Sequence, residues 1–478
     1  MAQAAQTLGG TAGPAITIAV ASGPRTLNPA TATDAAGARL LQLTHPALLG
    51  WTPTYQPSSL VAVSCTQPTL TAATCTLPSG RTFTDGTPLT AAAVATWLTQ
   101  LQSTPLSPFT TQLKGVTIKV VNATTLGFTL TSPTLGFLGT LTEIPIANPA
   151  NPSAGMGPYV VAGHDPLGAV TLTLAENSPI ASYPRTLTFT PLSDATTRLL
   201  KLKKGEVDAV LNDLPPQLVD WARTQGFPVV SVAGTSYSYL GLNHQHPVLG
   251  RPEVRHALAL AINRPAIRKH LLGGLAEPAT TLLPQNHPMV WNAPEEPFDP
   301  FAAESLLDDA GLLRGPDNTR TTLTLLTSTD PFSQRVAQAI QSQLAGIGIT
   351  LQLRPTEWAS FYDAVRKGRF DIVMLAWTGE QQPAFYFHAF NATQTPPAGL
   401  NRGHLNNPKV NQLTQAIMDA TTPETQRQAT LATQQQLAEA RPYIPLYRRH
   451  QILVTSPNLQ GCQLNANGFY TGLLACRK

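Results

Sequence analysis

The sequence predicts an α/β fold made of alternating strands and helices. Two observations lead to this class. Short segments whose apolar residues alternate or follow one another, as in strands, are interleaved with segments whose apolar residues repeat at the period of a helix. In addition, 478 residues are too many for one hydrophobic core, so roughly two to three domains are expected.

The first part of the chain is expected to form strands at residues 16–20, at the hairpin arms 60–65 and 74–77, and at residues 116–121 and 126–130. Asp85 and Gly86 predict a turn, and Thr90 predicts a helix start because its side chain can accept a hydrogen bond from the first helical turn. That helix has one apolar face, formed by Val94, Trp97, Leu98 and Leu101.

Residues 147–158 are rich in Pro, Gly and Asn and indicate a crossing between domains. Ser193 is then expected to cap a helix that reaches Lys204 and ends at Gly205, and a strand follows at residues 207–211. In the second half, helices that start at Pro252, Asp299, Ser333 and Thr422 alternate with strands at residues 237–243, 349–353 and 371–377. The last strand is continuously apolar, which predicts that it is buried.

Composition and charge argue against a nucleic-acid-binding protein. The net charge is only +4, and the basic residues are scattered and form no stripe. Charged residues make up 12% of the chain, about half the usual share. No apolar stretch approaches the ~18 residues of a membrane span. An ordered globular protein without a nucleic-acid partner is therefore expected.

Four cysteines lie in two pairs that are close in sequence, Cys65 with Cys75 and Cys462 with Cys476. This spacing predicts two disulfides in an oxidising compartment, with four unpaired thiols as the alternative. The first residues lack the basic start and the apolar core of a signal peptide. This absence fits either a cytosolic protein or a chain that begins at its mature end. The two cysteine pairs favour the second, so we expect an exported, periplasmic or otherwise extracytoplasmic chain whose signal peptide has been removed.

No motif nominates a catalytic or metal site. His244 and His246 would share one face of an extended strand, but no third ligand follows nearby, so a metal is not expected. Residues 234–238 depart from a nucleophile elbow at the last position, and neither a zinc-protease motif nor a phosphate-binding loop occurs. We expect a binding protein without catalytic residues or a cofactor, and an exported hydrolase is the alternative from another class.

One acidic residue stands out by its position. Glu380 follows the apolar strand that ends at Trp377, and ligands of α/β proteins bind at the carboxyl ends of strands. A carboxylate there can hold a cationic group of a ligand. An ordinary loop glutamate is the alternative.

Motifs of a known family occur in the same order from residue 27 to the end of the chain. Residues 83–90 (FTDGTPLT) resemble the F-x-D-G-x-P-[LF]-[TN] segment of the dipeptide- and oligopeptide-binding proteins, and residues 155–159 (GMGPY) resemble their G-T-G-P-Y. Residues 204–208 (KGEVD) and the stretch from 239 to 264, with YLGLN and VRHALALAINR, are similar to two more of their motifs. The chain thus resembles the extracytoplasmic solute-binding proteins of family 5, the receptors of ABC importers.

This resemblance implies a bilobed periplasmic-binding-protein fold of the cluster C type with an extra inserted domain. Residues 1–40, 155–235 and 447–478 would form a discontinuous lobe I, residues 41–154 the inserted domain II, and residues 236–446 lobe II. The ligand would lie in the cleft between the lobes, and hinge closure would present it to an ABC permease and ATPase complex. The receptor would be a monomer.

The resemblance also implies the ligand-binding residues. A bound peptide backbone would pair with Ala376, Trp377 and Thr378, and it would meet a loop that contains Thr33 and Ala35. Tyr237 is expected to lie near the ligand as well. Glu380 stands where the family usually has the Asp that holds the amino terminus of the ligand.

The sequence departs from the dipeptide-binding pattern at one charge. The arginine that grips a dipeptide carboxylate would fall near Thr327, and no arginine occurs there before Arg335. Strict dipeptide specificity is therefore not expected. The favoured hypothesis is a receptor for a peptide-like solute. One alternative is a receptor for a non-peptide solute such as a metal chelate, haem or an oligosaccharide. Another is a peptide-holding chaperone or sensor input.

Overall fold

A computed structural model describes residues 13–32, 34–178, 183–378 and 382–478. They form two compact units. The first contains the described residues up to Val232 together with Gln451–Lys478, and the second is Ala233–His450. These crossings lie close to the boundaries expected after residues 235 and 446, whereas the finer division at residues 40 and 155 stays a prediction. Strands and helices alternate through both units, so the α/β class is confirmed.

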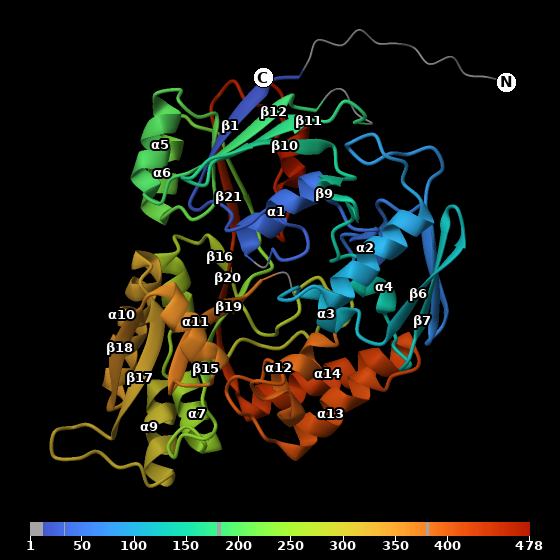
Figure 1. The fold of residues 1–478 in the computed structure, drawn as a ribbon. Helices are drawn as coiled ribbons and strands as arrows, with labels where there is room; N and C mark the ends of the chain where they lie inside the picture. The colour runs from blue at the N-terminus through green and yellow to red at the C-terminus, as the bar shows by residue number, and fades with distance from the viewer. Residues whose placement is uncertain (1–12, 33, 179–182, 379–381) are drawn as a thin grey trace. The chain divides into compact units, whose positions relative to one another are not determined.

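The first unit contains a seven-stranded sheet in the order β10-β11-β12-β1-β13-β21-β14. The strands are β1 (Ala15–Val20), β10 (Tyr159–His164), β11 (Val170–Leu174), β12 (Thr186–Pro191), β13 (Ala209–Leu211), β14 (Val229–Val232) and β21 (Gln451–Thr455). β1 is parallel to both of its neighbours. The helices packed with this sheet include α1 (Ala35–Thr44), α5 (Ala195–Lys203) and α6 (Pro216–Thr224), and α5 and α6 lie side by side in Figure 1.

The same unit contains a four-stranded antiparallel sheet in the order β4-β5-β7-β6. Its strands are β4 (Ser64–Thr69), β5 (Ala72–Thr76), β6 (Val116–Asn122) and β7 (Thr125–Leu130). The helices are α2 (Ala91–Ser103), α3 (Phe109–Gln112) and α4 (Phe137–Thr140), and two small sheets join β2 (Leu49–Trp51) to β3 (Pro57–Ser59) and β8 (Ala147–Asn148) to β9 (Asn151–Gly155). Thr90 caps α2 as predicted, by accepting a hydrogen bond from the backbone N–H of Ala93. All four predicted apolar positions of α2 are buried.

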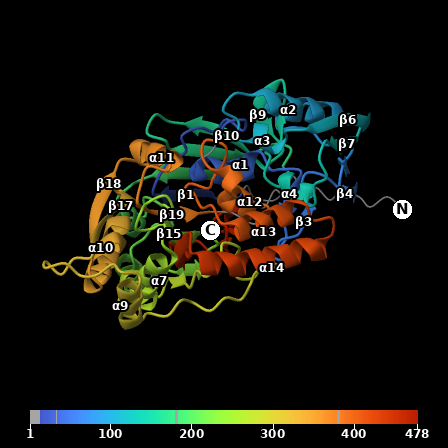
Figure 2. The ribbon, with the colours of Figure 1, turned by 90° about the horizontal axis from the view of Figure 1, so that it is seen from below.

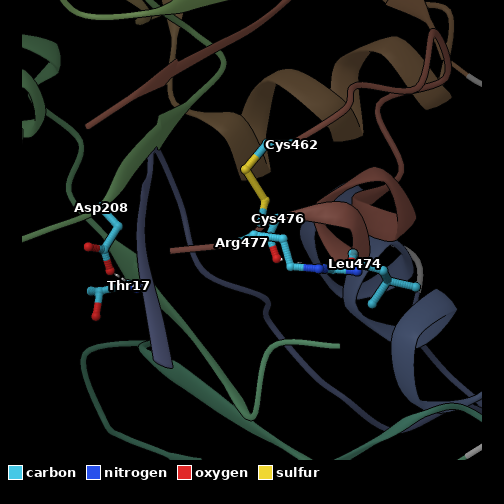
Figure 3. The surroundings of a disulfide bond; sticks show 6 residues. All are labelled: Thr17, Asp208, Cys462, Leu474, Cys476 and Arg477. Atoms are coloured by element: carbon cyan, nitrogen blue, oxygen red, sulfur yellow. Dashed lines mark hydrogen bonds between the residues drawn. A yellow bond between two sulfur atoms is a disulfide. The ribbon is translucent and has the colours of Figure 1, made fainter. Parts of the chain in front are cut away.

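Both predicted disulfides are present in the structure. Cys65 and Cys75 face each other across β4 and β5. The Cys462–Cys476 disulfide closes a loop near the end of the chain, and this loop contains the 3-10 helix η3 (Tyr470–Ala475). Figure 3 shows this second disulfide, with the Arg477 guanidinium donating to the carbonyl oxygens of Leu474 and Cys476.

The two family-like glycine motifs of the first unit contact each other. The backbone N–H of Thr84, in the segment 83–90, donates to the carbonyl oxygen of Gly155 at 3.0 Å. Gly155 and Gly157 also lie directly against α1, because an added Cβ would be 2.1 Å from the carbonyl oxygen of Thr44 and 2.2 Å from that of Leu43. Only glycine fits such close backbone approaches.

The second unit contains a six-stranded sheet in the order β16-β20-β15-β19-β17-β18. Its strands are β15 (Tyr237–Leu242), β16 (Ala276–Glu277), β17 (Thr321–Ser328), β18 (Ile349–Thr356), β19 (Ile372–Trp377) and β20 (Tyr443–Arg449). One face packs on a core that includes α7 (Pro252–Leu260), α9 (Pro300–Asp309) and α10 (Pro331–Gly346). The other face carries α11 (Trp358–Arg366), α12 (Phe385–Phe390), α13 (Pro408–Met418) and α14 (Pro423–Ala440).

α12, α13 and α14 pack against each other in sequence order, as Figure 2 shows. The shorter segments of this unit are α8 (Arg264–Ala266), the π-helical turn η1 (Ile267–Leu271) and the 3-10 turn η2 (Ala392–Gln394). Within the described ranges, no helix combines the length and apolar character that a bilayer crossing requires.

Four local predictions are wrong. The hairpin arm expected at residues 60–65 is the strand Ser64–Thr69, and the helix expected from Ser333 begins at Pro331, with Asp330 as its cap. Asp194, and not Ser193, caps α5, because the Asp194 carboxylate accepts the backbone N–H of Thr197 at 2.6 Å. The strand expected from residue 207 begins at Ala209. Serine and aspartate cap helices about equally well, so the residue types alone did not distinguish these two adjacent positions.

Candidate functional site

The strand β19 has one open edge. β15 pairs with it along its whole length. On the other side, β17 pairs with it only at Ile372 and Val373. In the part of the chain that the structure describes, no strand pairs with that side of β19 from Met374 to Trp377. Such an edge presents backbone N–H and C=O groups with which an extended peptide can pair.

Exposure changes along β19 at the same point. Ile372 and Val373 are buried, whereas Ala376 and the following Thr378 are exposed and Trp377 is half-buried. The prediction of a strand buried over its whole length is therefore wrong for its second half. The cause is the separation of the parallel strands β17 and β19, which leaves their carboxyl ends apart. In α/β proteins, ligands bind at such positions.

The structure brings Ala376, Trp377, Thr378 and Tyr237 together. Tyr237 is opposite Trp377 in the register of β15 and β19, and the hydroxyls of Ser236 and Thr378 are 3.2 Å apart. The Tyr237 side chain, however, is only 5% exposed. Its ring stacks on that of a neighbouring tyrosine and lies under the Arg448 guanidinium. The Tyr237 side chain therefore packs among the aromatic residues of the second unit, and its contact with a ligand stays a prediction.

Three predicted site residues remain, namely Glu380, Thr33 and Ala35. Glu380 and Thr33 lie outside the described residues. Ala35 is the exposed first residue of α1, in the first unit, where the Asp34 side chain caps the helix by accepting from Gly37. Their part in ligand binding stays a prediction.

The Trp377 ring packs against a cluster of aromatic rings. The centre of the Tyr239 ring lies 6.2 Å from that of Trp377 and 4.0 Å from that of Tyr443. The Phe385 ring packs edge-on against the indole, with 4.9 Å between the ring centres. Burial raises the pKa of both Tyr239 and Tyr443, so their hydroxyls stay neutral.

One residue near this cluster was missed by the sequence analysis. The guanidinium of Arg402 lies 4.6 Å from the centre of the Trp377 ring and 5.7 Å from that of Tyr362. A weak signal was present, because Arg402 is the one Lys, Arg, Asp or Glu between Glu380 and Lys409. Nothing in the sequence places that loop beside β19.

A pocket of about 610 Å³ also lies inside the second unit, and Tyr237, Trp291 and Tyr443 contribute to its wall. Two of its three carboxylates are in ion pairs, and the third, Glu439, accepts a hydrogen bond from the Gln436 amide. Glu296 binds the guanidinium of Arg441, and its neighbour Glu295 binds that of Arg268. The pocket therefore offers apolar surface and little free charge, and we regard the open edge of β19 as the stronger candidate.

His244 and His246 have different surroundings. His246 Nδ1 accepts the backbone N–H groups of Val248 and Leu249 at 3.2 and 3.4 Å, so it stabilises a turn. Burial lowers the pKa of His244 to about 3, and its Nε2 has no partner among the described residues. Searched over the same residues, the chain shows no cluster of three or more His, Cys, Asp or Glu side chains that could hold a metal.

Comparisons with known proteins identify the relatives of the chain. Residues 58–397 match the model of the bacterial extracellular solute-binding proteins, family 5. The chain is 28% identical over 324 residues to the probable di/tripeptide-binding protein 5 of Pseudomonas aeruginosa, a match that covers 66% of this chain and 60% of the relative. It is 25% identical over 473 residues to the glutathione-binding protein GsiB of Escherichia coli O1:K1, which covers 93% of this chain and 91% of the relative.

The fold matches solved structures over nearly its whole length. The crystal structure of NikA from Brucella suis in complex with Fe(III)-EDTA superposes with a TM-score of 0.89 at 19% identity, and the match covers 97% of this chain and 100% of that one. At this identity the likeness establishes the bilobed α/β fold.

Proposed function

This chain belongs to the bacterial extracellular solute-binding proteins of family 5, and we propose that it is an exported receptor that binds a short peptide-like solute for an ABC importer. The observation that supports a peptide ligand is the open edge of β19 from Met374 to Trp377. Ala376 on this edge and the following Thr378 are exposed. A peptide backbone there would extend the sheet by one strand. The named di/tripeptide- and glutathione-binding relatives support this solute class.

Glu380 is the proposed partner of the amino terminus of the solute. It follows the exposed end of β19 by three residues in the chain. A charge-assisted hydrogen bond between a carboxylate and an ammonium group contributes about 1.5–3 kcal/mol. Because the family commonly has the shorter Asp at this position, the longer Glu side chain would hold the amino terminus about one bond length further back.

Calorimetric titration with Ala-Ala, Ala-Ala-Ala and glutathione tests the proposal. We expect Glu380→Gln to weaken the binding of Ala-Ala-Ala by roughly tenfold to a hundredfold, because it keeps the shape and removes the charge. Glu253→Gln, an exposed glutamate on α7, is the control and should leave the affinity unchanged. Binding of Fe(III)-EDTA in the absence of any peptide binding would contradict the peptide and favour a non-peptide solute.

A further inference from the structure

Arg402 differs from the other buried arginines of this protein. It is 8% exposed, and four further arginines are at least as buried, namely Arg198, Arg255, Arg264 and Arg448. Each of those four donates hydrogen bonds to backbone carbonyl oxygens. The Arg402 side chain makes no hydrogen bond or ion pair with any described residue, and its recorded contacts are with the two aromatic rings.

The loop that carries Arg402 is held firmly from both sides. Asn401, which is 2% exposed, donates to the carbonyl oxygens of Asn391 and Leu405 and accepts the backbone N–H of Leu405. On the other side, the backbone N–H of His244 donates to the carbonyl oxygen of Gly403 at 2.8 Å. The position of Arg402 beside the end of β19 is therefore set by the fold.

No described anion compensates the charge of Arg402. The neighbouring phenols, Tyr239 and Tyr443, stay neutral because burial raises their pKa against the opposing effect of this arginine. Asp363, which follows Tyr362 on α11, already binds Lys367 and forms a second ion pair with a nearby arginine. Stacking on the two rings occupies the faces of the Arg402 guanidinium, and its N–H donors, which bind no described residue, can bind an acceptor from a ligand.

We propose that Arg402 is the counter-charge for a carboxylate of the bound solute, which for a short peptide is its carboxyl terminus. The guanidinium is fixed on the Trp377 ring, beside the open edge of β19, and its donors are available for a bidentate carboxylate. This role rests on the proposed function, and it assigns a carboxylate to one end of the solute.

The end of the neighbouring strand β17 does not supply such a charge. Thr327 lies there, is 0% exposed, and has a hydroxyl without a hydrogen-bond partner in the described chain. The next arginine, Arg335, lies on α10 with its guanidinium over the Phe332 ring at 5.9 Å. Arg402 thus brings a positive charge to this end of the sheet from a different segment of the chain.

Matched pairs of peptides test the proposal. Ala-Ala and Ala-Ala-Ala are titrated as free acids and as C-terminal amides into the wild type, Arg402→Gln, Arg402→Lys and Arg366→Gln. The wild type should bind the acids roughly tenfold to a hundredfold more tightly than the amides. Arg402→Gln should remove this preference and keep the amide affinity, Arg402→Lys should keep part of the preference, and Arg366→Gln, which alters an exposed arginine of α11, should keep all of it.

Each other outcome is decisive. If the wild type binds acids and amides equally, or if Arg402→Gln keeps the preference, the proposal is wrong while the peptide function stands. If Arg402→Gln weakens acids and amides by the same factor, Arg402 is a packing residue and the proposal is again wrong. If the wild type binds none of the four peptides, the proposed peptide function fails and this inference fails with it.

Discussion

At the scale of single residues, His45 is a buried imidazole that the first unit keeps neutral. It is 2% exposed, and its Nε2 lies 3.1 Å from the carbonyl oxygen of Pro152. A carbonyl oxygen only accepts, so Nε2 carries the proton, and Nδ1 accepts the hydroxyl of Thr44 at 2.8 Å. Burial lowers the pKa of His45 to about 4, despite the opposing hydrogen bond to Pro152.

This shift predicts a pH-dependent stability. The unfolded chain binds a proton at His45 below about pH 6.5, whereas the folded chain does so only near pH 4. The contribution of neutral His45 is therefore complete above pH 6.5 and is lost as the pH falls towards 4. Between pH 7 and 4.5, we expect His45 to account for about 2–3 kcal/mol of the loss in the free energy of unfolding.

Urea unfolding of wild type and His45→Gln at both pH values measures this difference. Glutamine can still donate to Pro152 and does not titrate, so the variant should lose about 2–3 kcal/mol less than the wild type on acidification. His164→Gln removes an exposed histidine and should follow the wild type. Equal losses in wild type and His45→Gln would show that this imidazole does not govern the acid response.

The residue-level site was only partly predictable. Ala376, Trp377 and Thr378 follow from the family-like motif at the end of an apolar run, and the structure places them at the open edge. The burial of the Tyr237 side chain depends on which sheet face is covered by α12–α14, and that is a tertiary property. The sequence could not assign Arg402 to the site, because its guanidinium packs on the Trp377 ring, which lies 25 residues earlier in the chain.

At the scale of elements, the predicted cap of α2 is present in the structure. Thr90, with its side chain bonded to the backbone N–H of Ala93 at 3.1 Å, begins a helix whose apolar face fills the core beside the four-stranded sheet. We expect Thr90→Ala to lower the free energy of unfolding of the first unit by about 1 kcal/mol. Thr96→Ala, an exposed site on the same helix, is the control, and its hydroxyl only bonds back to Ala92.

The measurement is the midpoint of urea unfolding, followed by circular dichroism. A destabilisation by Thr90→Ala no larger than that of Thr96→Ala would mean that the cap contributes nothing to α2.

Most elements with local signals were predicted to within a few residues, whereas the half-burial of β19 depends on a distant partner strand. The start of α14 at Thr422 follows from capping chemistry, which the structure shows as a reciprocal pair of hydrogen bonds with Thr425. The half-burial of β19 has no local signal. An apolar run is compatible with a fully covered strand, and only the departure of β17 after Leu326 uncovers its end.

At the scale of the whole molecule, the chain divides into two units with separate hydrophobic cores. The chain passes between them at Val232–Ala233 and at His450–Gln451. The boundaries that the family resemblance implied after residues 235 and 446 lie close to these passages, and no composition change marks them. A small number of chain crossings is what a hinge needs, because few backbone torsions must change when two units move.

This division leads to a prediction about ligand binding. A receptor that delivers its solute to a permease must report occupancy by a change of conformation, so we expect the two units to move towards each other when a peptide binds. Small-angle X-ray scattering should show a smaller radius of gyration with saturating Ala-Ala-Ala than without it. Glu380→Gln, at a peptide concentration that saturates only the wild type, should stay at the unliganded value. An unchanged radius of gyration for a wild type that calorimetry shows to be saturated would contradict hinge closure, since binding would then leave the arrangement of the units as it was.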